Sequence, residues 1–123
     1  MVKNTEATEK TIDTILEGIK KIKGENISII DLNTINYTEC GYFIICQGNS
    51  NTQVSSIANS VEETVKEVTG ENAWHTEGYK NAMWVLIDYG EIVVHVFQKD
   101  VRSFYNLEGL WADAKITKVD SEN

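Results

Sequence analysis

The run YFIIC, residues 42–46, is the strongest constraint on the fold because every residue in it is apolar. A strand projects successive side chains to opposite faces of its sheet, so such a run is typical of a central strand covered on both sides. GNSNTQV (48–54) follows after Gln47, and its Ser50 and Gln53 match a capping box at the start of a helix that Gly70 ends. A layered arrangement of sheet and helices is therefore required. The apolar face of this helix is predicted to carry Val54, Ile57, Ala58, Val61, Val65 and Val68.

The rest of the chain supplies the partners of this strand. Apolar residues at helical spacing predict an earlier helix over residues 12–22, with Gly24 as its left-handed C-terminal cap. The order of elements predicts an α/β (α+β) fold in which helices flank one mixed β-sheet. We expect a single domain over residues 1–123, with residues 118–123 as a flexible tail. Strands are predicted at residues 26–32 and 73–79, a tight hairpin at 84–90 and 91–98, and short helical turns at 100–105 and 106–114.

The charge and apolar content of the sequence limit the classes of partner that the protein can bind. The formal net charge of the 123 residues is −8, which argues against binding DNA and favours a basic protein partner. Lys20, Lys21 and Lys23 are attributed to the C-terminal end of the first helix, where cations complement the helix dipole. No apolar run approaches the ~20 residues that a membrane helix needs. The first residues lack the apolar stretch of a secretory signal, so we expect no membrane association and a cytoplasmic location.

The residues that could carry chemistry form no recognisable catalytic or metal motif. Cys40 and Cys46 are not spaced as in a zinc motif. His95 could serve as a base, but no serine lies in a G-x-S-x-G turn for it to activate. Two-metal transfer needs converging carboxylates, whereas Asp88 and Glu91 flank a turn. We therefore expect no enzyme activity, no catalytic residue, no cofactor and no metal.

The turn at residues 48–50 leaves one alternative open. A Gly-Asn-Ser turn ahead of a helix can hold a phosphate, because free backbone N–H groups point outward there. It lacks the glycines and the lysine of a P-loop, so a capped helix start is the favoured interpretation. A divergent nucleotidyltransferase is the alternative function. It predicts magnesium-dependent binding of ATP near Gly48–Ser50, which calorimetry would detect.

Large aromatic residues favour recognition of another protein. Tyr, Trp and Arg supply most of the binding energy at protein interfaces. Some of these rings are expected to fill the core, and Trp84, at the start of the hairpin, is the leading candidate for exposure. Asp88 and Glu91 would place carboxylates beside it for a basic partner. The rings are those of Tyr79, Trp84, Tyr89, Tyr105 and Trp111.

The same residues resemble a known family. WVLIDYGEIVVHVFQ (84–98), followed by RSFYNLEGLW (102–111), is similar to the ribosomal silencing factor family, also called RsfS or Iojap-like. YFIICQGNSNTQV (42–54) and WHTEGY (74–79) fit the same family. The resemblance runs from the first helix to Ala114 and implies a nucleotidyltransferase-like fold without the catalytic acids. One departure is Gly41, where the family commonly has an aspartate, and it puts any polar role of that position in doubt.

The resemblance also implies a function. It implies a translational repressor that binds the large ribosomal subunit through ribosomal large-subunit protein fourteen. Bound there, it would sterically block joining of the small and large subunits when nutrients are scarce. A role in large-subunit biogenesis and a homodimer when the chain is free of the ribosome are implied as well.

We predict that the partner-binding surface lies on the hairpin and the short helices. Trp84 would anchor its apolar centre, and acidic groups would meet lysine or arginine. Tyr89 and His95 would form hydrogen bonds. The alternative for Tyr105 and Trp111 is that they pack the short helices onto the sheet. The predicted contact residues are Trp84, Asp88, Tyr89, His95, Tyr105, Glu108 and Trp111.

Overall fold

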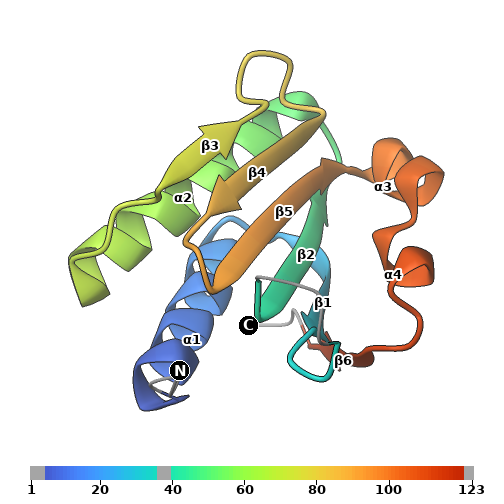
Figure 1. Cartoon of the computed structure of the whole chain (residues 1–123). Helices are drawn as coiled ribbons and strands as arrows, with labels where there is room; N and C mark the ends of the chain where they lie inside the picture. Colours follow the sequence, from blue (N-terminus) through green and yellow to red (C-terminus); the bar gives the residue numbers. More distant parts are fainter. Residues whose placement is uncertain (1–4, 36–39, 121–123) are drawn as a thin grey trace.

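A mixed β-sheet forms the centre of the structure (Figure 1). The computed structural model describes residues 5–35 and 40–120. Within them the six strands lie in the order β3-β4-β5-β2-β1-β6, with β2 and β5 parallel and the other neighbours antiparallel. The predicted mixed sheet flanked by helices is confirmed. The elements are α1 (Thr5–Lys21), β1 (Glu25–Asp31), β2 (Tyr42–Gly48), α2 (Asn51–Thr69), β3 (His75–Glu77), β4 (Trp84–Asp88), β5 (Ile92–Gln98), α3 (Lys99–Tyr105), α4 (Leu107–Leu110) and β6 (Lys115–Val119).

The helices α1 and α2 cover one face of the sheet (Figure 1). Ile15 of α1 and Ile57 of α2 are fully buried in one core with Ile44 of β2. This confirms the central, covered position predicted for YFIIC. Val68 departs from the predicted apolar face, since its side chain is 44% exposed. The last turn of α2 extends past the sheet (Figure 1).

The caps of α2 are as predicted. The Ser50 hydroxyl accepts from the backbone N–H of Gln53 at 3.1 Å, and the Gln53 side chain accepts from the N–H of Asn49 at 2.8 Å. Gly70 ends the helix with a left-handed φ of 79°. Side chains and turn geometry thus satisfy backbone groups that the helix itself leaves unpaired.

The end of α1 differs from the prediction by one residue. Lys23, not Gly24, adopts the left-handed conformation, with a φ of 58°. The N–H of Gly24 donates to the carbonyl of Ile19 and that of Lys23 to Lys20, both at 3.0 Å, which is a Schellman motif. Gly24 is required for space instead, because a Cβ there would lie 2.5 Å from Ile19 Cγ2.

The C-terminal segment also departs from the prediction. Lys118 and Val119, expected in a flexible tail, belong to β6, which pairs with β1. Ile116 packs into the core on one face of the sheet and Val119 into the core on the other. The segment was not predicted because two apolar residues among polar ones are a weak local signal, whereas the pairing with β1 stabilises the strand. Residues 121–123 of the expected tail lie outside the described residues.

The opposite face of the sheet is only partly covered. The helices α3 and α4 lie along one side of it (Figure 1) and enclose a second core that includes Ile30, Ile45 and Phe97. Leu86 of β4 and Val93 of β5 lie beyond this cover and are half-buried. The sheet therefore leaves Leu86 and Val93 partly open to solvent on this face.

Gly41 is held firmly at the start of β2. Its N–H donates to the carbonyl of Glu91 and its carbonyl accepts from Leu32, both at 2.8 Å. A Cβ at this position would lie 1.8 Å from Glu91 Oε1, so the Glu91 side chain fills the space of a residue-41 side chain. Although the aspartate is absent, the carboxylate of Glu91 therefore lies close to where an aspartate at position 41 would place its own.

Candidate functional site

Trp84 lies at the centre of an aromatic cluster on the open face. Its ring stacks on Phe97, its cross-strand partner in β5, with ring centroids 4.8 Å apart. Tyr105 of α3 meets the same indole at 4.8 Å. Trp84 is half-buried and Tyr105 is 47% exposed, so both predicted residues reach the surface. The structure thus brings together residues that are 21 positions apart in sequence.

His95 supports this cluster from below. It is only 4% exposed, and its Nδ1 accepts a hydrogen bond from Trp84 Nε1 at 3.1 Å. Phe43 meets the imidazole edge-on at 4.7 Å. Burial lowers the pKa of His95 to about 4, so the ring is neutral near pH 7 and Nε2 carries the proton. The prediction gives His95 a hydrogen bond to the partner, but the ring is buried among Phe43, Trp84 and Phe97 and orients Trp84 instead.

The turn of the hairpin places two further predicted residues apart from the cluster. Tyr89 is 6% exposed and packs into the core under α1 and α2, so it has no surface to offer on the open face. Asp88 is half-buried, and its carboxylate accepts from the N–H of Gly90 at 2.7 Å. Four residues of strand put Asp88 about 13 Å from Trp84. Burial of Tyr89 follows from the alternation of β4, which continues into the turn.

Glu108 has an arginine partner within the chain. Arg102 is 8% exposed and donates to Glu108, to the backbone carbonyl of Asn26, and to Gln47 and Ser28. Burial alone would raise the pKa of Glu108, but the hydrogen bond and charge of Arg102 outweigh it and hold the pKa below its usual value. The predicted role of Glu108, meeting a partner's lysine or arginine, is therefore replaced by fastening α3 and α4 to β1 and β2.

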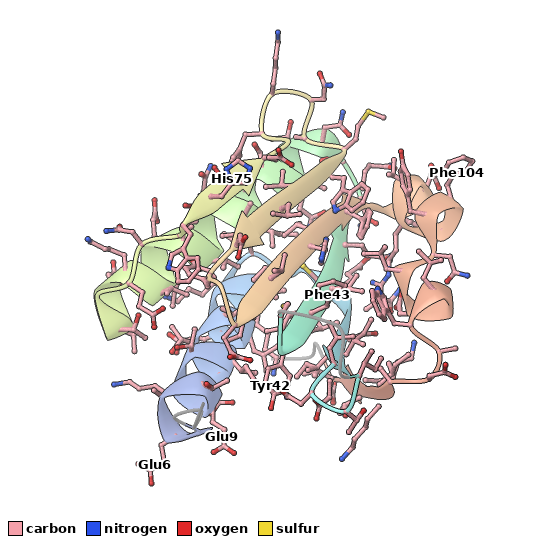
Figure 2. All side chains as sticks on the ribbon, viewed as in Figure 1. Glu6, Glu9, Tyr42, Phe43, His75 and Phe104 are labelled. Atoms are coloured by element: carbon pink, nitrogen blue, oxygen red, sulfur yellow. The ribbon has the colours of Figure 1, made fainter. Side chains whose placement is uncertain are left out.

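Trp111 follows α4 and packs mainly inward. It is half-buried, contacts the second core, and meets Phe43 edge-on with centroids 6.0 Å apart. Figure 2 shows Phe43 on the sheet face towards α4. The alternative interpretation of Trp111, packing the short helices onto the sheet, is the one that the geometry supports.

Three exposed apolar residues of the segments around this cluster were absent from the predicted set. Phe104 is 83% exposed, Leu110 72% and Met83 47%. Figure 2 shows Phe104 pointing away from the sheet at the outer side of α3. Adjacent helical residues differ in direction by about 100°, so Phe104 and Tyr105 cannot both face the sheet. This geometric argument could have predicted the exposure of Phe104 from the sequence. The helix α3 is too short to show a periodic apolar stripe.

Phe104 and Met83 border an open groove of about 470 Å³ between α3 and the loop that precedes β4. Met83, Trp84, Val101, Phe104 and Tyr105 line it. Asp100 lies at its edge, and Glu77 borders a smaller hollow on the other side of Trp84. An apolar floor with carboxylates at its rim is suited to a basic protein surface that also carries an apolar group.

Neither a metal site nor an activated thiol is found among the described residues. No group of three or more His, Cys, Asp or Glu is placed there to hold a metal ion. Burial raises the pKa of Cys46 to about 12, so its thiol stays protonated. The N–H groups of Asn49 and Gln53 in the candidate phosphate turn are bound within the helix cap. No helix in residues 5–35 or 40–120 is both long and apolar enough to cross a membrane.

Comparison with known proteins places this surface in context. The family model described as "Ribosomal silencing factor during starvation" matches residues 5–123. Ribosomal silencing factor RsfS of Bacillus subtilis is 44% identical over 98 residues, which cover 80% of this chain and 81% of the relative. RsfS of Halalkalibacterium halodurans is 36% identical over 114 residues, covering 93% and 96%.

Solved structures agree with these sequence relatives. A crystal structure from Chromobacterium violaceum superposes with a TM-score of 0.79 at 32% identity and covers 94% of this chain and 95% of its own. One from Bacillus halodurans gives a TM-score of 0.75 at 36% identity, covering 91% and 98%. With a family model that spans nearly the whole sequence and the same fold in these relatives, the chain belongs to the ribosomal silencing factor family.

Proposed function

We propose that this chain is a translational repressor that binds the large ribosomal subunit through ribosomal large-subunit protein fourteen. Bound there, it occupies space that the small subunit needs and blocks subunit joining when nutrients are limiting. The action requires no reaction and takes place in the cytoplasm. Assistance in large-subunit biogenesis would use the same attachment.

The exposed apolar groove of an acidic molecule is the observation that carries this proposal. Phe104 exposes most of its side chain in the groove beside Trp84, and Leu110 does so on the following helix α4, although large apolar side chains that face water gain nothing for a monomer. The net charge is −8, and Asp100 borders the groove. These features fit a basic protein better than they fit ribosomal RNA, whose phosphates the chain would repel.

The proposed contact surface differs from the predicted one. Trp84 and Tyr105 remain at its centre, and Phe104, Leu110 and Met83 join them. Asp88 and Trp111 stay as peripheral candidates on the same face, because each is half-buried. Trp84 is also part of the fold, so its replacement by alanine would weaken both binding and stability. Phe104 and Leu110 therefore make cleaner probes.

The test combines binding and subunit joining. A variant with Phe104→Ala and Leu110→Ala should bind purified large subunits at least tenfold more weakly, with an unchanged melting temperature. Wild-type chain in excess should suppress formation of joined ribosomes in a sucrose gradient, and the variant should not. Val68→Ala is the matched control, since it removes an exposed apolar side chain from the other face. Normal joining with saturating wild-type chain would refute the proposal.

We also propose that the free chain self-associates through this groove as a homodimer. A second copy would cover the same exposed rings that the ribosomal partner covers. Sedimentation of the wild type should then depend on concentration, and that of the Phe104→Ala and Leu110→Ala variant should not. If the wild type and the variant sedimented equally, the groove would not be the dimer contact.

A further inference from the structure

A second aromatic feature lies at the other end of the hairpin. The side chain of Trp74 is 79% exposed, yet its ring lies flat against the turn. A Cβ at Gly90 would come within 2.7 Å of the indole, and the Trp74 N–H donates to the carbonyl of Asp88 at 2.8 Å. A ring that is held in place and left open to solvent is typical of a binding surface. The groove beside Trp84 does not include it.

A small hole lined by both polar and apolar side chains lies beside this turn. It measures about 110 Å³ and is enclosed by the first half of α1, the segment after α2 and the β4–β5 turn, which lie next to one another in Figure 1. Tyr89 and Glu91, the two neighbours of Gly90, both line it, as does Glu71. The ring of Trp74 thus packs on Gly90, which lies between Tyr89 and Glu91 in the sequence.

The hydroxyl of Tyr89 requires a partner that the described part of the chain does not supply. Tyr89 is 6% exposed, and its Oη has no hydrogen bond to any described residue. Buried hydroxyl groups are almost always hydrogen-bonded, and leaving one unpaired is costly. A group that enters the hole from outside would satisfy it.

The charges around the hole select a cation. Burial raises the pKa of Tyr89 well above its usual value, and the negative charges of Glu62 and Glu71 add to the shift. Glu71 takes part in no ion pair within residues 5–35 and 40–120, and one of its oxygens accepts from the Thr11 hydroxyl at 3.1 Å. Glu91 contributes a second carboxylate to the lining. The potential in the hole is therefore negative.

We propose that Trp74 and this hole form a binding site for a lysine side chain of a basic protein. The ammonium group enters between Glu71 and the Tyr89 hydroxyl, and its three N–H donors match oxygen acceptors on the walls. The alkyl stem lies along the indole of Trp74, where cation–π attraction adds to apolar contact. A compact ammonium suits a hole that would hold roughly three or four water molecules.

The test uses the full isolated chain and short peptides, so its outcome does not depend on the ribosome. The indole N–H of Trp74 and the backbone amides of residues 89–91 are followed by NMR during titration with acetyl-Gly-Lys-Gly-amide. These signals should shift and saturate. The same peptide with norleucine, which lacks the charge, should cause no saturable shift. An equal response to norleucine, or none to lysine, would overturn the proposal.

Variants locate the bound group. Tyr89→Phe removes only the hydroxyl, and Glu71→Gln only the charge; each should weaken lysine-peptide binding about tenfold, the loss expected for a hydrogen bond to a charged group. Glu63→Gln, an exposed acid on α2, should leave binding unchanged. Tyr89→Phe should not lower the melting temperature, since the hydroxyl has no described partner. Equal affinity of all three variants would refute the lysine site, as would tighter binding of a third peptide, acetyl-Gly-Arg-Gly-amide.

Discussion

Trp84 and His95 act as a pair at the scale of single residues. The imidazole Nδ1 accepts the indole N–H at 3.1 Å while almost wholly buried. A half-buried indole could otherwise turn, so this bond selects one orientation for the largest ring of the groove. In the proposed complex, His95 would contribute to binding without touching the partner.

Two replacements of His95 should distinguish its role in orienting Trp84 from its role in packing the core. His95→Leu removes the acceptor, leaves the Trp84 N–H unpaired, and should lower affinity for the large subunit about fivefold. His95→Asn places an amide oxygen near the position of Nδ1 and should restore most of that affinity, even though a smaller side chain costs stability. Binding is measured by co-sedimentation, and the NMR shift of the indole N–H reports the bond. Equal binding of the Leu and Asn variants would exclude an orienting role.

The buried imidazole also predicts a pH dependence of stability. The pKa of His95 is lowered from 6.5 to about 4 by burial. The unfolded chain therefore takes up a proton between pH 6.5 and pH 4 that the folded chain does not, so stability is complete above pH 6.5 and declines as pH falls. The free energy of unfolding in urea should drop by about 2 kcal/mol from pH 7 to pH 5. His95→Asn should lose most of this slope; an unchanged slope would place its source elsewhere.

At the scale of elements, sequence patterns correctly predicted the features that depend on interactions between residues close in sequence. The capping box of Ser50 and Gln53, the left-handed Gly70 and the β4–β5 hairpin all depend on residues within a few positions of one another. Strand β6 depends on pairing with β1, more than 80 residues away, and its own sequence says little. Burial of His95 likewise depends on cover by distant elements. The predicted contact set therefore included residues, His95 and Tyr89, that the structure buries.

Arg102 fastens the α3–α4 unit to the sheet. It bonds to β1, to β2 and to Glu108 from a position that is 8% exposed. Arg102→Met should lower the free energy of unfolding by about 3 kcal/mol, because it leaves a partly buried carboxylate unpaired. Glu108→Gln keeps a neutral acceptor and should cost much less. Urea unfolding gives both values, and hydrogen exchange of α3 should rise in the Met variant. Equal stability of the two variants would show that the Arg102–Glu108 pair does not hold α3 and α4 on the sheet.

Over the whole molecule, the two faces of the sheet have different roles. The covered face holds α1 and α2 and supplies most of the core. The open face exposes apolar side chains beside α3, in a chain whose net charge is −8. Solved relatives retain the backbone at 32% and 36% identity. A rigid scaffold of this kind can present a fixed surface, and overall charge then governs how quickly a basic partner finds it.

This division predicts how binding responds to salt. Long-range attraction between an acidic chain and a basic partner speeds association, whereas apolar contacts in the groove slow dissociation. Raising salt from 0.05 to 0.5 M should lower the association rate with purified ribosomal large-subunit protein fourteen about tenfold and change the dissociation rate little. Asp100→Asn with Glu77→Gln should lower the association rate, while Phe104→Ala should raise the dissociation rate. Stopped-flow measurement separates the two rates. If salt acted mainly on dissociation, charge pairs and not the apolar groove would hold the complex together.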